Sequence, residues 1–184
     1  ASLERLGVDS VDAYMIHWPG VWQNEAYADG LAEVVELGLA KSVGVSNHSV
    51  DQMRAASNIL AKRGVPLSFN QVQYSLLYQN VEENGMLEAV KELDMVLMAY
   101  SPLAMGLLTG KYSSNNPPPG ARGQLYQPVL EHLDPLLAAM SRVGEAHDGK
   151  SIPQVSKQTS HGATMEGSYY NDVQGPGASA LLAK

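Results

Sequence analysis

Four short stretches of the sequence place hydrogen-bonding or aromatic side chains directly after apolar runs that have the character of strands. Imidazole, amide, hydroxyl and phenol groups can all bind a carbonyl oxygen or a carboxamide. Polar residues also end strands because strands end at the surface, but four such endings in one chain favour a shared site. The stretches are VDAYMIHW (11–18), KSVGVSN (41–47), SFNQVQY (68–74) and MVLMAYS (95–101).

Helical patterns separate these four runs. Ser49 and Gln52 form a capping-box signal, and the pattern that follows ends at Gly64. Further helices are expected to begin at Asn80, with Glu83 as its capping partner, and at Asp134 before Pro135, and one is expected to end at Gly38.

The alternation of strands and helices predicts an α/β fold with parallel strands. Strand starts at residues 11, 42, 68 and 95 are 31, 26 and 27 residues apart. An open doubly wound sheet and a (β/α)8 TIM barrel both fit this spacing. The turn HWPGVWQ lacks the glycine-rich fingerprint of a dinucleotide-binding open sheet, so the barrel is favoured. About four β/α units make an incomplete barrel.

Composition narrows the class of function. The formal net charge of −7 argues against nucleic acid or an anionic membrane as the main partner. The sequence has no cysteine, which excludes disulfides and thiolate chemistry. No apolar run approaches the roughly 20 residues of a membrane span. We expect a soluble, intracellular protein without a metal site.

The motifs at the strand ends resemble those of the aldo/keto reductases, most of all plant, plastid-type members. The resemblance covers residues 1–156 and implies a (β/α)8 barrel that binds NADPH/NADP and reduces a small aldehyde or ketone. The resemblance also makes the cytoplasm or a plastid the expected location. The motifs are SLERLGVDSVDAYMIHWPG (2–20), GLAKSVGVSN (38–47), FNQVQYSLLY (69–78) and MAYSPLAMGLLTGKY (98–112).

The resemblance also implies roles for individual residues. His17 matches the histidine of the family's catalytic tetrad, which orients the substrate carbonyl and stabilises charge developing on its oxygen. Ser46, Asn47 and Gln71 match the groups that hold the nicotinamide carboxamide, and Tyr100 matches the aromatic residue that stacks on the nicotinamide ring.

A second set of residues matches the loop that lies along the cofactor pyrophosphate. Backbone N–H groups and one lysine would supply its local positive character. The residues are Ser101, Leu103, Gly106 and Lys111.

Two departures from the family pattern qualify these expectations. The Asp, Tyr and Lys of the tetrad find no match in the sequence, so only His17 is carried over. Residues 157–184 are glycine-rich without a sustained period, and we expect a divergent, irregular tail after a partial barrel over 1–156. The alternative to a reductase is therefore a non-catalytic nucleotide-binding or oligomerising module, which self-associates through the open barrel edge.

Overall fold

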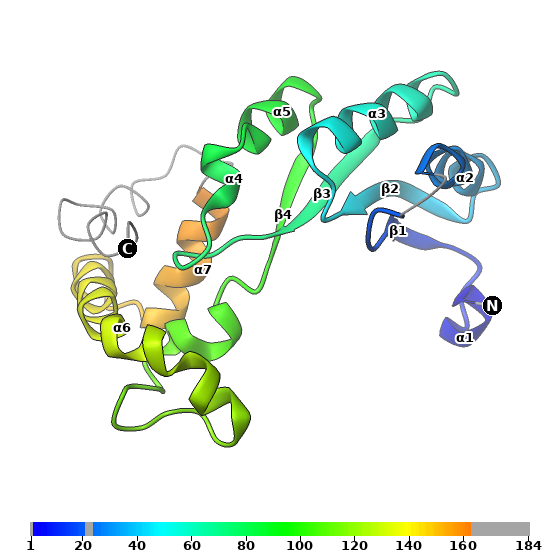
Figure 1. Cartoon of the computed structure of the whole chain (residues 1–184). Helices are drawn as coiled ribbons and strands as arrows, with labels where there is room; N and C mark the ends of the chain where they lie inside the picture. Colours follow the sequence, from blue (N-terminus) through cyan, green and yellow to red (C-terminus); the bar gives the residue numbers. More distant parts are fainter. Residues whose placement is uncertain (1, 21–23, 163–184) are drawn as a thin grey trace. The chain divides into compact units, whose positions relative to one another are not determined.

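The computed structural model describes residues 2–20 and 24–162 (Figure 1). The chain divides into two compact units. The first, which we call the sheet unit, comprises Ala1–Val72 and Asn80–Tyr100. The second, the helical unit, comprises Gln73–Gln79 and Ser101–Lys184.

A four-stranded sheet with the order β1-β2-β3-β4 organises the sheet unit (Figure 1). Both β1 and β3 pair with β2 in parallel, and a register shift at Val43/Gly44 interrupts the second pairing. All four predicted strands are confirmed, with boundaries within two residues of the stretches given above. The strands are β1 Val11–Ile16, β2 Ala40–Ser46, β3 Leu67–Gln73 and β4 Val96–Tyr100.

Helices connect the strands of the sheet unit. The predicted capping box is present, since the Ser49 hydroxyl accepts from Gln52 N–H and the Gln52 side chain accepts from Ser49 N–H. The prediction of one helix from Asn80 was wrong, because Gly85, in a left-handed conformation, separates two short helices. The helices are α1 Ser2–Leu6, α2 Asn24–Glu36, α3 Val50–Ala61, α4 Asn80–Glu83 and α5 Met86–Glu92.

Burial differs between the strands of the sheet. Val43 and Val45 of β2 are fully buried, whereas Val96 and Met98 of β4 are exposed on either side of the buried Leu97. Alternating exposure indicates that helices cover one face of β4 and that the other face is open. Within β2, a Cβ added to Gly44 would lie 2.3 Å from Cε2 of Phe69, so the Phe69 ring occupies the space that a side chain would need.

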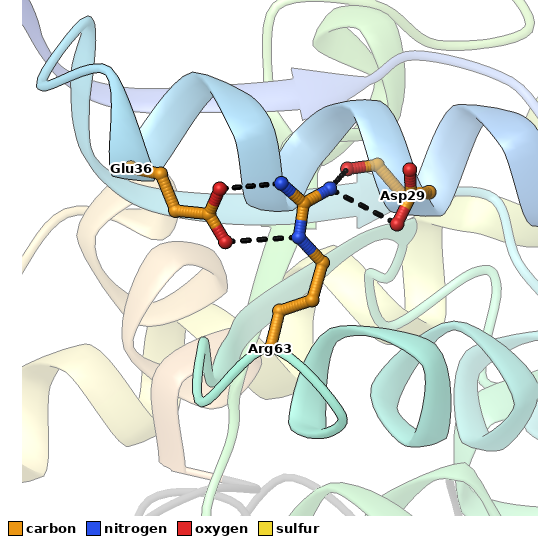
Figure 2. A network of polar contacts seen from close by, with 3 residues as sticks. All are labelled: Asp29, Glu36 and Arg63. Carbon is orange, nitrogen blue, oxygen red and sulfur yellow. Dashed lines mark hydrogen bonds and ion pairs between the residues drawn. The ribbon is translucent and has the colours of Figure 1, made fainter.

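One arginine ties two helical segments of the sheet unit together (Figure 2). The Arg63 guanidinium donates to both carboxylate oxygens of Glu36, and at 3.0 Å to the carboxylate and the carbonyl of Asp29. These two acceptors hold the pKa of Arg63 above its ordinary value. Because Asp29 and Glu36 belong to α2, the contact fixes the end of the α3 segment against α2.

The helical unit packs apolar side chains from three helices into one core. Its elements are the 3-10 helix η1 Ala104–Thr109, α6 Ala121–Ala146 and α7 Ile152–Gly162. The fully buried side chains include Leu108, Leu130, Leu133, Met140 and Val155.

The structure differs from the predictions at the start of α6 and at the start of the predicted tail. Asp134-Pro135 was predicted to begin a helix, but α6 begins at Ala121 and runs through Pro128 and Pro135. Burial of Leu130 and Leu133 on the preceding turns stabilises the longer helix and overrides the local proline signal. The predicted tail begins within α7, which continues to Gly162, and residues 163–184 lie outside the described part of the chain.

Candidate functional site

The turn after β2 is the centre of the candidate site. Asn47 adopts a left-handed conformation, with φ of 58°, that favours glycine and asparagine over other residues. Its backbone N–H donates to the Gln71 carbonyl at 2.9 Å. Its side-chain amide donates to the His17 carbonyl at 3.3 Å and to the Ser46 hydroxyl at 3.0 Å. Asn47 therefore links the ends of β1, β2 and β3.

Ser46 completes the link between β2 and β3. Its hydroxyl is fully buried, donates to the Gln71 carbonyl at 2.9 Å and accepts from the Asn47 amide. With both of these bonds made, the Ser46 hydroxyl serves in this structure to orient Asn47. A carboxamide ligand would bind this hydroxyl only in exchange for one of its present partners.

The end of β4 joins the same network through a phenol. The Tyr100 hydroxyl donates to the Asn47 side-chain oxygen at 2.9 Å, which fixes the direction of the aromatic ring. On the neighbouring strand, the Gln71 side-chain amide has the Met98 sulfur as its partner at 3.3 Å. A sulfur is a weak acceptor, so a ligand carbonyl would be a better partner for this amide.

The His17 side chain is exposed at the carboxyl end of β1. Its ring lies 6.2 Å, centroid to centroid, from the ring of Trp18, which is also exposed. Since the Asn47 amide holds the His17 carbonyl, the backbone that carries the imidazole is anchored to the same network. The structure thus joins His17, by its main chain, with Ser46, Asn47, Gln71 and Tyr100.

Two buried residues beneath this turn had no assigned role in the sequence. The His48 ring nitrogen Nδ1 lies 3.0 Å from the Ser46 carbonyl, and the Asn70 amide donates to the His48 carbonyl at 3.0 Å. Burial lowers the pKa of His48 below its ordinary value, although the bond to the Ser46 carbonyl acts in the opposite direction. The FNQ motif contains Asn70, but nothing in its spacing indicates that the side chain turns inward.

The second set of predicted residues lies in the helical unit, within a loop shaped by backbone conformation. Ser101, Ala104, Met105 and Gly106 all have positive φ values, between 46° and 97°. The Leu103 carbonyl accepts from Gly106 N–H at 2.9 Å, and the Gly106 carbonyl accepts from the Thr109 hydroxyl at 2.6 Å. The N–H groups of Ala104 and Gly106 are thus bonded within the loop, so an anion would have to bind other N–H groups of this segment.

Lys111 follows this loop and is exposed. Its ammonium lies 5.3 Å from the centroid of the Tyr112 ring, and its carbonyl accepts from the Asn116 side chain at 3.0 Å. Ser101, Leu103, Gly106 and Lys111 are thus grouped in one short segment of the helical unit. The predicted sites for the carboxamide and the pyrophosphate fall into different units.

Two further features of the described residues bear on function. Within residues 2–20 and 24–162, no three His, Asp or Glu side chains gather closely enough to hold a metal ion. In the same residues, no helix combines the length and the apolar character needed to cross a membrane.

Comparison with known proteins shows the family to which the chain belongs. The model of the Aldo/keto reductase family matches residues 1–158, which is most of the chain. The chain belongs to the aldo/keto reductase family. Its four strands alternating with helices form an incomplete α/β barrel, as the sequence predicted.

Three particular proteins illustrate the similarity. The chloroplastic pyridoxal reductase of Arabidopsis thaliana is 41% identical over 160 residues, covering 85% of this chain and 44% of the relative. An aldo-keto reductase of Schizosaccharomyces pombe, whose name specifies NADP(+), is 34% identical over 116 residues, which are 61% of this chain and 33% of the relative. The solved glycerol dehydrogenase of Gluconobacter oxydans superposes with a TM-score of 0.78 at 25% identity, covering 99% of this chain and 61% of that one.

The chain spans less than half the length of either curated relative. Both relatives are oxidoreductases by name.

Proposed function

We propose that the chain forms the nicotinamide-binding part of an NADP-dependent oxidoreductase that reduces a small aldehyde or ketone. The network that joins the ends of β1 to β4 is the observation that supports this proposal. Amide and hydroxyl groups gather there around Asn47, and a primary carboxamide is the ligand group that such a donor and acceptor set recognises.

The chemistry of this donor set fits a nicotinamide. When bound, NADPH supplies a hydride to the carbonyl carbon of the substrate. The Asn47 side-chain oxygen has one lone pair beyond the bond from Tyr100, and the Gln71 amide has only a sulfur to exchange. These two side chains would bind the carboxamide, and the half-buried Tyr100 ring would lie against the nicotinamide.

His17 is proposed to act on the substrate. An exposed imidazole N–H can donate to the substrate carbonyl oxygen and stabilise the negative charge that develops there as the carbon is reduced. Anchoring of the His17 carbonyl by Asn47 would couple the position of this donor to the nicotinamide-binding groups. The proton donor matching the family's tyrosine has no counterpart among the residues carried over.

The loop of the helical unit is proposed to bind the cofactor pyrophosphate. Backbone N–H groups of this segment other than those of Ala104 and Gly106, which are bonded within the loop, and the Lys111 ammonium would supply the positive character. The name of the S. pombe relative supports NADP over other nucleotides, and the chloroplastic relative supports a plastid among the two predicted compartments.

NADPH titration followed by nucleotide fluorescence tests the proposal. We expect saturable but weak binding by the chain and no turnover of pyridoxal or another small aldehyde, because only the histidine of the tetrad is matched. Asn47→Ala should weaken binding about tenfold, since a bond to a neutral group contributes roughly 1–1.5 kcal/mol. Absence of any NADPH binding would contradict the proposal. Turnover above background would contradict the expectation that catalysis requires the three unmatched residues of the tetrad.

A further inference from the structure

Asn70 is a buried amide with unusual pairing. Its side chain has no exposed surface, and its amide nitrogen faces the His48 carbonyl at 3.0 Å and the Met86 sulfur at 3.4 Å. Its side-chain oxygen is buried without a hydrogen-bond partner. An unsatisfied buried acceptor is unfavourable, and an apolar side chain of similar size would avoid that cost. The unpaired oxygen is therefore a local cost that accompanies the bond to the His48 carbonyl.

The bond that Asn70 makes acts on the turn that carries the site. His48 directly follows Asn47, so holding the His48 carbonyl fixes the His48–Ser49 peptide, one residue beyond Asn47. On the other side, the Ser46 carbonyl is held by the His48 ring at 3.0 Å. His48 is only 4% exposed, so both ties are shielded from water. Together they hold the peptides before Asn47 and after His48, which bracket the one residue of the turn with a positive φ.

We propose that Asn70 is a positioning residue for nicotinamide recognition, acting through the His48 carbonyl to hold Asn47 in its left-handed conformation. The proposal rests on the proposed function, because it assigns Asn70 to the support of the same carboxamide-binding group. Residues that lower stability while supporting a binding group are expected at functional sites. Asn70 itself touches neither cofactor nor substrate.

Asn70→Leu separates a positioning role from a purely structural one. Leucine is close in size, removes the unpaired oxygen, and removes the donor to the His48 carbonyl. The two changes oppose each other in stability, so the thermal midpoint should stay within a few degrees of wild type. Hydrogen exchange of the Asn47 N–H, which donates to the Gln71 carbonyl, should accelerate at least tenfold. The dissociation constant for reduced nicotinamide mononucleotide should rise about tenfold.

Leu67→Ala is the matched control, because Leu67 is buried at the opposite end of the same strand. It should lower the thermal midpoint without changing the nucleotide affinity of the folded chain. Asn70→Ala provides a second variant without a donor in case Asn70→Leu does not fold. All measurements use the full chain, NMR-detected exchange and titration with reduced nicotinamide mononucleotide.

The outcomes are distinct. Faster Asn47 exchange with weaker binding and a nearly unchanged midpoint supports the proposal. Unchanged Asn47 exchange in both Asn70 variants overturns it, and so does a midpoint loss like that of Leu67→Ala with unchanged affinity. If the wild-type chain does not bind the nucleotide while Asn47 exchange still accelerates in Asn70→Leu, the support of the turn holds and the proposed function fails.

Discussion

The two predicted halves of the cofactor site are built in different ways. In the sheet unit, side chains of Ser46, Asn47 and Tyr100 hydrogen-bond one another, and a single residue of that turn has a positive φ. In the helical unit, the loop over 101–106 has four residues with positive φ, and its carbonyls accept both from backbone N–H groups and from the side chains of Thr109, Arg122 and Ser156. The turn at Asn47 thus presents bonded side-chain amide and hydroxyl groups, whereas the loop over 101–106 is distinguished by its four residues with positive φ.

This difference matches the chemistry expected at each half. A carboxamide presents one donor group and one acceptor in a fixed geometry, which oriented side chains can distinguish. A pyrophosphate presents many equivalent oxygens and negative charge, which backbone N–H groups can bind without distinguishing them. The four predictions that follow test the contrast, from the largest expected effect to the smallest.

Core truncation tests whether the two units are also separate in stability. Leu60→Ala in the sheet unit and Leu133→Ala in the helical unit each remove a side chain at most 2% exposed, and each should cost about 2–5 kcal/mol. If the units unfold separately, each variant shifts one transition in differential scanning calorimetry and leaves the other in place. A single transition that both variants shift equally would contradict this separation.

A backbone change in the loop should affect only the pyrophosphate half. Gly106 has φ of 97°, and an added Cβ would meet only Tyr112, at 3.4 Å. Gly106→Ala should therefore cost about 1–3 kcal/mol through backbone strain and weaken NADPH binding. Binding of reduced nicotinamide mononucleotide, which lacks the pyrophosphate, should not change.

Gly149→Ala is the control for Gly106→Ala. Gly149 has φ of 68° and open space around its Cα, so the variant imposes comparable strain away from the loop. A loss of NADPH affinity in the Gly149 variant equal to that of the Gly106 variant would show that strain alone weakens binding.

Because His48 is buried in the sheet unit, we expect the thermal stability of that unit to depend on pH. Burial lowers the pKa of His48 in the folded state, whereas in the unfolded chain it lies near the ordinary value of about 6.5. The unfolded state then binds more protons, so this contribution to stability is present above about pH 6.5 and is lost as pH falls below it. The thermal midpoint of the sheet unit should fall more steeply between pH 7 and 5 than in His48→Asn, which keeps a donor but does not titrate there.

Equal slopes in wild type and His48→Asn would show that His48 does not titrate in this range. The Asp12–Lys41 pair does not contribute to the change in thermal midpoint between pH 7 and 5. Lys41 lowers the pKa of Asp12 from its ordinary value, so that carboxyl loses its contribution only at more acidic pH.

The smallest effect is expected at Arg63, whose printed partners, Asp29 and Glu36, are not residues of the candidate site. Arg63→Lys keeps the charge but loses the planar pairing with both oxygens of Glu36 (Figure 2). The thermal midpoint should drop slightly, and nucleotide affinity should stay at the wild-type value. A change in nucleotide affinity would show that the packing of α2 against the α3 segment influences the residues at the strand ends.

The sequence predicts the strands well because their apolar runs are short and bounded by glycine, proline or polar residues. It also predicts that Asn47, Gln71 and Tyr100 gather at one edge of the sheet, since parallel strands end on the same side. The start of α6 was missed because Asp134-Pro135 resembles a helix start, and only burial of Leu130 and Leu133 shows otherwise.

The supporting residues of the site could not be predicted in the same way. Nothing in the motif FNQVQY distinguishes an inward Asn70 from a solvated one, because strand direction and the register shift at Val43/Gly44 decide which face it occupies. His48 likewise has no ligand-like spacing to the other histidines. Its position under the turn follows from the left-handed Asn47 before it.

Titration of the full chain with reduced nicotinamide mononucleotide, observed through side-chain amide resonances, tests the central claim most directly. We predict that the resonances of Asn47 and Gln71 shift together and saturate with one dissociation constant, and that the aromatic resonances of Tyr100 shift with them. Shifts confined to residues away from the ends of β2, β3 and β4, or different saturation at Asn47 and Gln71, would contradict a single nicotinamide site at this edge of the sheet.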